Sequence, residues 1–158
     1  KKWILSKITV IFINIVFMYM TAAIICFMFG KRKITFNSEL FEKYFGTDYF
    51  IQNNENKFLY ILVFFAAPII ASFAISMVQI AFSLAVKNMA GFIISMIIYI
   101  ISIFDINIFL PGNGCMAQRS SLFMENGLSV SQVIIIDIII IVITLIIQLK
   151  IISVKDIL

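Results

Sequence analysis

The sequence predicts an all-α fold: a polytopic membrane bundle of four transmembrane helices, with short extracellular helices lying at the membrane surface. The first ground is composition. Of the 158 residues, 63% are hydrophobic and 13% are charged, whereas a soluble domain carries about 25% charged residues. The second ground is segment length, because a helix needs about 20 apolar residues to cross a bilayer core of about 30 Å. Four segments of the chain meet that requirement.

These segments form one predicted transmembrane domain covering residues 1–158, with spans at residues 8–29, 58–85, 89–110 and 133–152. The second segment is longer than a crossing requires, so a tilt or kink is expected there. The fourth is rich in isoleucine, which also suits a buried strand. Its length exceeds that of ordinary strands, and in lipid only a helix satisfies its own backbone without a partner.

The loops predict how the spans are arranged. Only a few residues around Lys87 separate the second and third spans, which predicts an antiparallel helical hairpin. In the longer loop before the second span, residues 38–45 place aromatic side chains at helical spacing. We interpret them as a short amphipathic helix on the membrane surface, with an irregular loop as the alternative. Residues 116–124 predict two more helical turns before the last span.

An even number of spans places both chain ends on the same side of the cell membrane. Lysine and arginine residues divide equally between the two faces, so the positive-inside rule alone does not orient the chain. Short loops with basic tips are typical of the cytoplasmic face, and the opposite face carries most of the acidic residues. We therefore expect both termini to be cytoplasmic.

Asp105 and Asp137 are the sharpest candidate site residues, because a charge in the hydrocarbon core is costly and usually faces water or a bundle interior. Each lies about one helical turn inside the same face of the predicted bundle. Their functional interpretation is a polar pathway lining or a shared proton. The alternative is that each caps a neighbouring loop near the interface. Paired carboxylates can act as acid and base, but no nucleophile accompanies them, so no catalytic residue is predicted.

Three further residues are candidates for packing or for a pathway: Asn14, Gln79 and Pro68. The two amides lie in the middle of their spans, where they commonly hydrogen-bond across helices, and a substrate contact is the alternative. Pro68 should kink the second span, because it removes a backbone donor. Small residues recur at four-residue spacing and predict close helix packing, either inside the bundle or at a dimer interface: Ala67, Ala71, Ala74, Ala81, Ala85, Gly91 and Ser95.

Several classes of site are disfavoured by what the sequence lacks. It has no histidine and only two cysteines, Cys26 and Cys115, which gives no metal-site spacing and at most one disulfide on the outer face. No metal or cofactor site is predicted. The basic residues lie at the ends of apolar runs and mark water boundaries, so no nucleic-acid partner is expected. There is no G-x-x-x-x-G-K loop, so any ATP hydrolysis must come from a separate subunit.

Three short stretches resemble bacterial type-2 ATP-binding-cassette export permeases. KKWILSKI at residues 1–8 resembles the entry to their third span, and FLPGN at residues 109–113, followed by Met116 and Arg119, resembles the outer loop before their last span. SVKDIL at residues 153–158 resembles their usual ending. The chain departs from the family at Gly114 and Cys115, where a bulkier polar or aromatic pair is expected.

The resemblance is closest to permeases of peptide or bacteriocin export and immunity systems. It implies that this chain is the later four of six spans, that a preceding N-terminal part is missing, and that both termini are cytoplasmic. It also implies three partners: a cytoplasmic ATP-binding-cassette ATPase, a second permease subunit in a homo- or heterodimer, and the lipid membrane. The expected function is a permease subunit exporting peptides or antimicrobial compounds, and not an enzyme. The alternative is a non-transporting immunity or scaffold protein.

Overall fold

The computed structural model describes residues 2–29, 62–121 and 127–155, and it is helical over most of these ranges. Four α-helices make up the described part: α1 (Lys2–Phe29), α5 (Ala67–Ala85), α6 (Asn88–Phe104) and α7 (Val130–Lys155). A π-helical segment, η1 (Leu62–Ala66), leads into α5, and two short 3-10 helices lie between α6 and α7. These are η2 (Pro111–Cys115) and η3 (Ala117–Arg119). The predicted all-α class is confirmed for these ranges.

Three of the four helices are long and apolar enough to cross a membrane: α1, α5 with its π-helical start, and α7. Side chains of large apolar residues cover the outside of the bundle, including Phe17 at 69% exposure and Met89 at 71%. Exposed apolar surface of this extent needs a covering, and lipid supplies it for helices of this length. The chain is therefore a multi-pass membrane protein.

The third predicted span, residues 89–110, is wrong at its C-terminal end. Helix α6 begins at Asn88 and ends at Phe104, which makes it 17 residues long. Asp105 follows in an extended conformation, with φ −120° and ψ 130°. Asn107 then turns the chain, because its side-chain oxygen accepts a hydrogen bond of 3.0 Å from the Phe109 backbone N–H. Side chains that bond locally to the backbone in this way compete with helix continuation.

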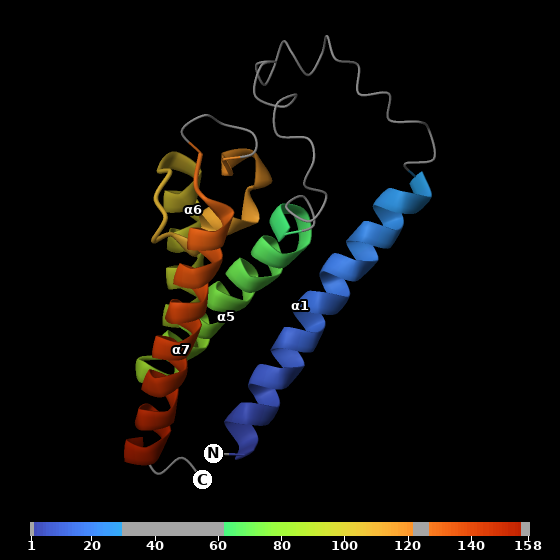
Figure 1. Ribbon diagram of the computed structural model, residues 1–158. Coiled ribbons are helices and arrows are strands. Elements are labelled where there is room, and N and C mark those ends of the chain that lie inside the picture. The colour runs from blue at the N-terminus through green and yellow to red at the C-terminus, as the bar shows by residue number, and fades with distance from the viewer. Residues whose placement is uncertain (1, 30–61, 122–126, 156–158) are drawn as a thin grey trace.

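The helices run alternately up and down, so the start of α1 and the end of α7 lie at the same end of the molecule (Figure 1). Helix α5 occupies the centre, and α1, α6, α7 and η2 all pack against it. Its buried face is built largely from alanines, at Ala67, Ala71, Ala74 and Ala81. These four alanines therefore pack within the bundle, as do the buried Gly91 and Ser95 of α6, whereas Ala85 is exposed.

Helix α1 stands at the side of the bundle and packs along α5 (Figure 1). Two specific contacts join these helices. The Tyr19 hydroxyl lies 2.9 Å from Ser72 Oγ, and the rings of Phe12 and Phe73 meet edge to face with centroids 5.2 Å apart. Most of the remaining α1 surface is exposed and apolar.

The predicted surface helices have mixed outcomes. Residues 38–45 lie outside the described residues. The two helical turns predicted over residues 116–124 are wrong where the structure describes them: only a single 3-10 turn forms, at Ala117–Arg119. Ser120 then forms an isolated bridge with Leu128. The backbone bonds of this bridge, Leu128 N–H to Arg119 O at 2.7 Å and Ser121 N–H to Leu128 O at 2.9 Å, close the base of the loop.

Candidate functional site

The segment η2 enters the bundle instead of lying on its surface. Pro111, Gly112, Asn113 and Gly114 are all buried. Non-helical backbone at membrane depth is tolerated only where protein or a water-filled cavity surrounds it. Here α5, α6 and α7 surround it, since η2 contacts all three.

Two glycines make this entry sterically possible. A Cβ at Gly112 would overlap the Ser102 side chain of α6. A Cβ at Gly114 would lie 2.9 Å from Ala71 Cβ of α5 and 3.1 Å from a carboxylate oxygen of Asp137 on α7. The Gly114 position therefore brings η2 into direct contact with two helices at once, and a larger residue there requires a shift of backbone or side chains.

Arg119 and Asn113 hold η2 in place by bonding to carbonyls in the last turn of α6 and in the residues that follow it. The last carbonyls of a helix have no partner within the helix. Arg119 donates to the Ser102 carbonyl, to the Ile103 carbonyl at 2.5 Å and to the Asp105 carbonyl at 3.0 Å. Asn113 Nδ2 donates to the carbonyls of Asp105 and Asn107, at 3.1 and 2.8 Å. These bonds explain how α6 can end at Phe104 while backbone carbonyls at this end of the helix still have hydrogen-bond donors.

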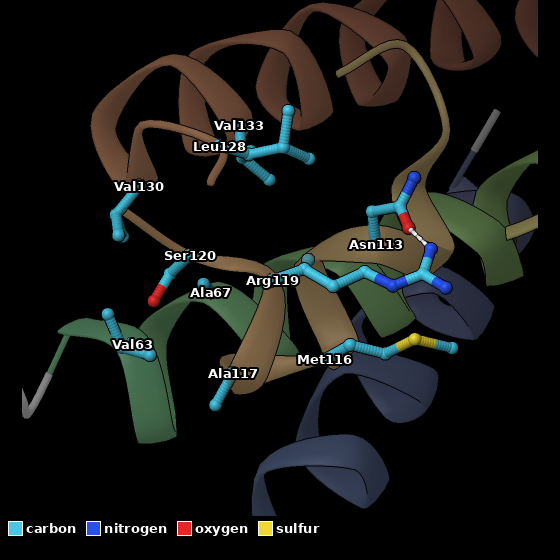
Figure 2. Close-up of a pocket in the computed structure, with 11 residues that line it drawn as sticks. Val63, Ala67, Asn113, Met116, Ala117, Arg119, Ser120, Leu128, Val130 and Val133 are labelled. Atoms are coloured by element: carbon cyan, nitrogen blue, oxygen red, sulfur yellow. Dashed lines mark hydrogen bonds between the residues drawn. The ribbon is translucent and has the colours of Figure 1, made fainter. Parts of the chain in front are cut away.

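A small cavity of about 20 Å³ lies beside this network (Figure 2). Val63, Val130 and Val133 are among its apolar lining residues, and the Arg119 side chain, which also lines it, extends toward Asn113. Ser120 Oγ lines the cavity and is buried without a hydrogen-bond partner among the described residues. A space of this size is large enough for a single water.

Asp137 is the most unusual residue of the described chain. Its side chain is fully buried, and neither carboxylate oxygen has a hydrogen-bond partner among the described residues. It lies on α7 where that helix meets Gly114 of η2. A buried carboxylate without partners is costly in a membrane, which makes Asp137 a candidate functional residue.

A line of polar side chains connects the Asp137 region with α1. Cys115, the residue after Gly114, is a free thiol whose Sγ lies 3.6 Å from Ser72 Oγ. Ser72 in turn pairs with the Tyr19 hydroxyl. Burial raises the pKa of the Cys115 thiol, while the bond to Ser72 acts in the opposite direction. Tyr19, Ser72, Cys115 and Asp137 thus form a polar cluster contributed by α1, α5, η2 and α7.

The structure places the two candidate aspartates in different surroundings. Asp105 is exposed beyond the end of α6, and it is the backbone carbonyl of this residue that bonds to Asn113 and Arg119. Asp137 is buried against α5 and η2. Among the described residues neither Asp137 oxygen has a hydrogen-bond partner, so its carboxyl is not bonded to that of Asp105.

The structure places the other three candidate residues separately. Asn14 is exposed on α1. Pro68 is the second residue of α5, directly after the π-helical η1 gives way to the α-helix. Gln79 lines a separate cavity between α1 and α5. The side chain of Cys26 lies outside what the structure describes, but Cys115 is a free thiol, so the possible disulfide between these two cysteines is not formed in this structure.

Two features of the bundle interior were missed from the sequence. Gln148 on α7 is fully buried, and its Nε2 donates to the Met77 carbonyl of α5 at 2.8 Å. An amide side chain within an apolar span could have marked Gln148 as a candidate, as it did for Asn14 and Gln79. The roles of Tyr19 and Ser72 carried no comparable signal, because hydroxyl residues are common in spans that serve only packing.

Comparisons with protein-family models, with curated proteins and with solved structures found no match for this chain.

Proposed function

We propose that this chain is the membrane-spanning permease subunit of an ATP-binding-cassette exporter, with ATP hydrolysis on a separate cytoplasmic subunit. The observation that carries the proposal is the buried segment Pro111–Cys115, seated between three helices beside the unpartnered carboxylate of Asp137. Broken, non-helical backbone next to an intramembrane charge is typical of transport proteins, in which it lines the substrate path.

Further support comes from the outline of the bundle. Helix α6, at 17 residues, is near the lower length limit for a crossing, and we propose that it crosses the membrane as the third of four spans. Both chain ends then lie on one side, where we place the cytoplasm and the ATPase. The exposed apolar surface of α1 suits contact with lipid or with a second permease subunit in a homo- or heterodimer. The resemblance of residues 1–8, 109–119 and 153–158 to export permeases suggests peptides or antimicrobial compounds as cargo.

Affinity purification of the tagged full-length protein from its native membranes tests this proposal. In mild detergent we expect an ATP-binding-cassette ATPase in stoichiometric amount, and we expect the export or resistance phenotype to disappear when the phosphate-binding lysine of that ATPase is replaced. The rival function is a non-transporting immunity or scaffold protein. A phenotype that persists without any ATPase would favour that rival and refute the permease assignment.

A further inference from the structure

The Asp137 carboxyl lies inside the bundle, out of contact with bulk water. The residue is 0% exposed, and neither side-chain oxygen has a hydrogen-bond partner among the described residues. Asp137 lies about two turns into α7, roughly 10 Å from the start of the helix at Val130. At this depth a carboxyl must be neutral, paired or hydrated, because an isolated buried charge is costly.

The surroundings of this carboxyl at its contact with η2 are apolar. A Cβ on Gly114 would lie 3.1 Å from an Asp137 oxygen, 3.1 Å from Val133 Cγ1 and 2.9 Å from Ala71 Cβ. One carboxyl oxygen therefore shares a small space with two methyl groups, which neither donate hydrogen bonds nor coordinate a cation. Hard cations take several oxygen ligands, and the described ranges hold no group of three metal-ligating side chains. A metal ion is therefore a poor counter-ion for Asp137.

The elements that pack on α7 supply no positive charge to this carboxyl. The main ones are α5 and η2. Between Ala67 and Ala85, α5 contains no ionisable residue. The segment η2 contributes Cys115, and burial raises the pKa of that thiol, so it is neutral. The phenols of Tyr19 on α1 and Tyr99 on α6, which interact with Cys115, are also uncharged at neutral pH.

The described cations are engaged elsewhere or lie far along the bundle. Arg119 donates to carbonyls at the end of α6 and to Asn113. Lys150 and the residues that follow it on α7 lie about 20 Å or more beyond Asp137. The lysines in the first turns of α1 and at the α5–α6 turn lie at the opposite end of the bundle from the start of α7 (Figure 1). The species that best neutralises this carboxyl is therefore a proton.

Hydration of an ionised Asp137 is limited by the size of the adjoining cavity. Gly114 and Val133 both line the cavity of about 20 Å³, which has room for a single water. An ionised carboxyl has about four acceptor sites, so one water cannot hydrate it. Ionisation therefore requires that more water reaches Asp137, and η2 is seated against the carboxyl at Gly114.

We propose that Asp137 is a proton-binding site: the neutral acid keeps η2 seated between the helices, and release of the proton unseats η2 so that water reaches the carboxyl. A proton shared with Asp105 is not required, since the Asp105 carboxyl is exposed beyond α6. The site goes beyond the proposed export role, because it requires neither an ATPase nor a cargo.

Infrared difference spectroscopy of the full-length protein in liposomes tests whether Asp137 carries a proton. The carbonyl stretch of a protonated carboxylic acid is separate from the bands of a carboxylate, and it shifts in heavy water. At neutral pH we expect this band in wild type and its loss in Asp137→Asn. Asp105→Asn is the matched control, because that carboxyl is exposed, and it should remove only carboxylate absorption. A spectral difference confined to carboxylate bands in Asp137→Asn would overturn the proposal.

Labelling with dicyclohexylcarbodiimide tests the same proton without any variant. A neutral acid gives its proton to a nitrogen of this apolar reagent while the carboxyl oxygen adds to the central carbon, and the adduct rearranges to a stable N-acylurea with no leaving group. We expect peptide mass spectrometry to find the adduct on Asp137, with labelling that falls about tenfold per pH unit once the acid ionises. Absent or pH-independent labelling would contradict the proton site, and protection by sodium ions would identify a metal cation as the occupant.

The unseating of η2 is measured at the Cys115 thiol, in a Cys26→Ser background, by its rate of reaction with an uncharged maleimide. This rate rises with pH in any protein, because the thiolate is the reactive form, and Asp137→Asn supplies that baseline with a side chain that never ionises. At high pH we expect wild type to react about tenfold faster than the baseline, since proton loss shifts the seated equilibrium.

A charge on Asp137 by itself disfavours the Cys115 thiolate, so a faster reaction of wild type reports access to the thiol and not its ionisation. Equal rates in wild type and Asp137→Asn at every pH would show that η2 stays seated when Asp137 loses its proton, and would overturn that part of the proposal.

Discussion

The guanidinium of Arg119 donates a hydrogen bond of 2.5 Å to the side-chain oxygen of Asn113. Arg119 lies at the end of η3, and Asn113 lies within the buried η2. Arg119 also donates to the Ile103 carbonyl in the last turn of α6, and Asn113 donates to the carbonyl of Asp105, the residue after this helix. This pair therefore joins the end of one helix to the segment that enters the bundle.

The first prediction concerns Arg119. Replacing it by glutamine removes the donors that serve the Ser102 and Ile103 carbonyls, and one charged hydrogen bond contributes about 1.5–3 kcal/mol. We expect Arg119→Gln to lower the free energy of unfolding by about 2 kcal/mol, measured by denaturant titration in detergent. Arg119→Lys should be almost as damaging, because an ammonium lacks the planar fork that reaches several carbonyls at once. Wild-type stability in either variant would show that these bonds do not hold η2.

The second prediction concerns the close approach of Gly114. Gly114→Ala adds a Cβ at 2.9 Å from Ala71 Cβ, and overpacking of this kind costs about 1–3 kcal/mol. The compensating change is Ala71→Gly, which removes the methyl group that the new Cβ meets. The double variant should be more stable than the sum of the two single effects predicts. Additive effects would place the two residues out of contact.

These first two predictions rest on a part of the fold that the sequence indicated only loosely. Residues 109–113 resemble an outer loop, which indicates a connection between spans. The burial of residues 111–114 between three helices was not predictable from the sequence, because burial depends on which helix faces meet. Asn107, whose side chain bonds to the backbone of Phe109, indicates that the helix ends before it. The predicted span nevertheless continued to Leu110, because the residues around Asn107 are apolar.

The long spans were readable for a simple physical reason. The length of an apolar run sets whether a helix can cross a bilayer, and α1, α5 and α7 follow that rule. The inward faces were harder to find, because lipid-facing and core-facing residues are both apolar in a membrane helix. Asp137 was found because its charge is exceptional there, whereas the Tyr19–Ser72 contact depends on the tertiary arrangement of α1 and α5.

The third prediction compares the two aspartates. Asp137→Asn keeps the shape of the side chain and removes only a charge that has no partner among the described residues. We expect its melting temperature to stay close to that of wild type. If Asp137 serves the proposed pathway, ATP-dependent export or resistance should fall about tenfold, equivalent to about 1.4 kcal/mol in the activation free energy.

Asp105→Asn is the matched control for this experiment. Its carboxyl is exposed beyond α6, so the loss of its charge should leave export within about twofold of wild type, as for an exposed charge worth less than 1 kcal/mol. Full activity of Asp137→Asn at normal expression would leave Asp137 a structural residue. Equal losses in both variants would point to a general charge effect on the pathway.

The most direct test of the account is the sidedness of α6, because four crossings with both termini cytoplasmic require that the two ends of this helix lie on opposite faces. Lys87 precedes α6, and Phe109, at 70% exposure, follows it. Single cysteines at these positions, in a chain lacking Cys26 and Cys115, are labelled in intact cells with a membrane-impermeant maleimide. We predict labelling of Phe109→Cys from outside, and labelling of Lys87→Cys only after permeabilisation. Labelling of both positions from the same side would show that α6 does not cross, and the reverse pattern would contradict the cytoplasmic placement of the termini.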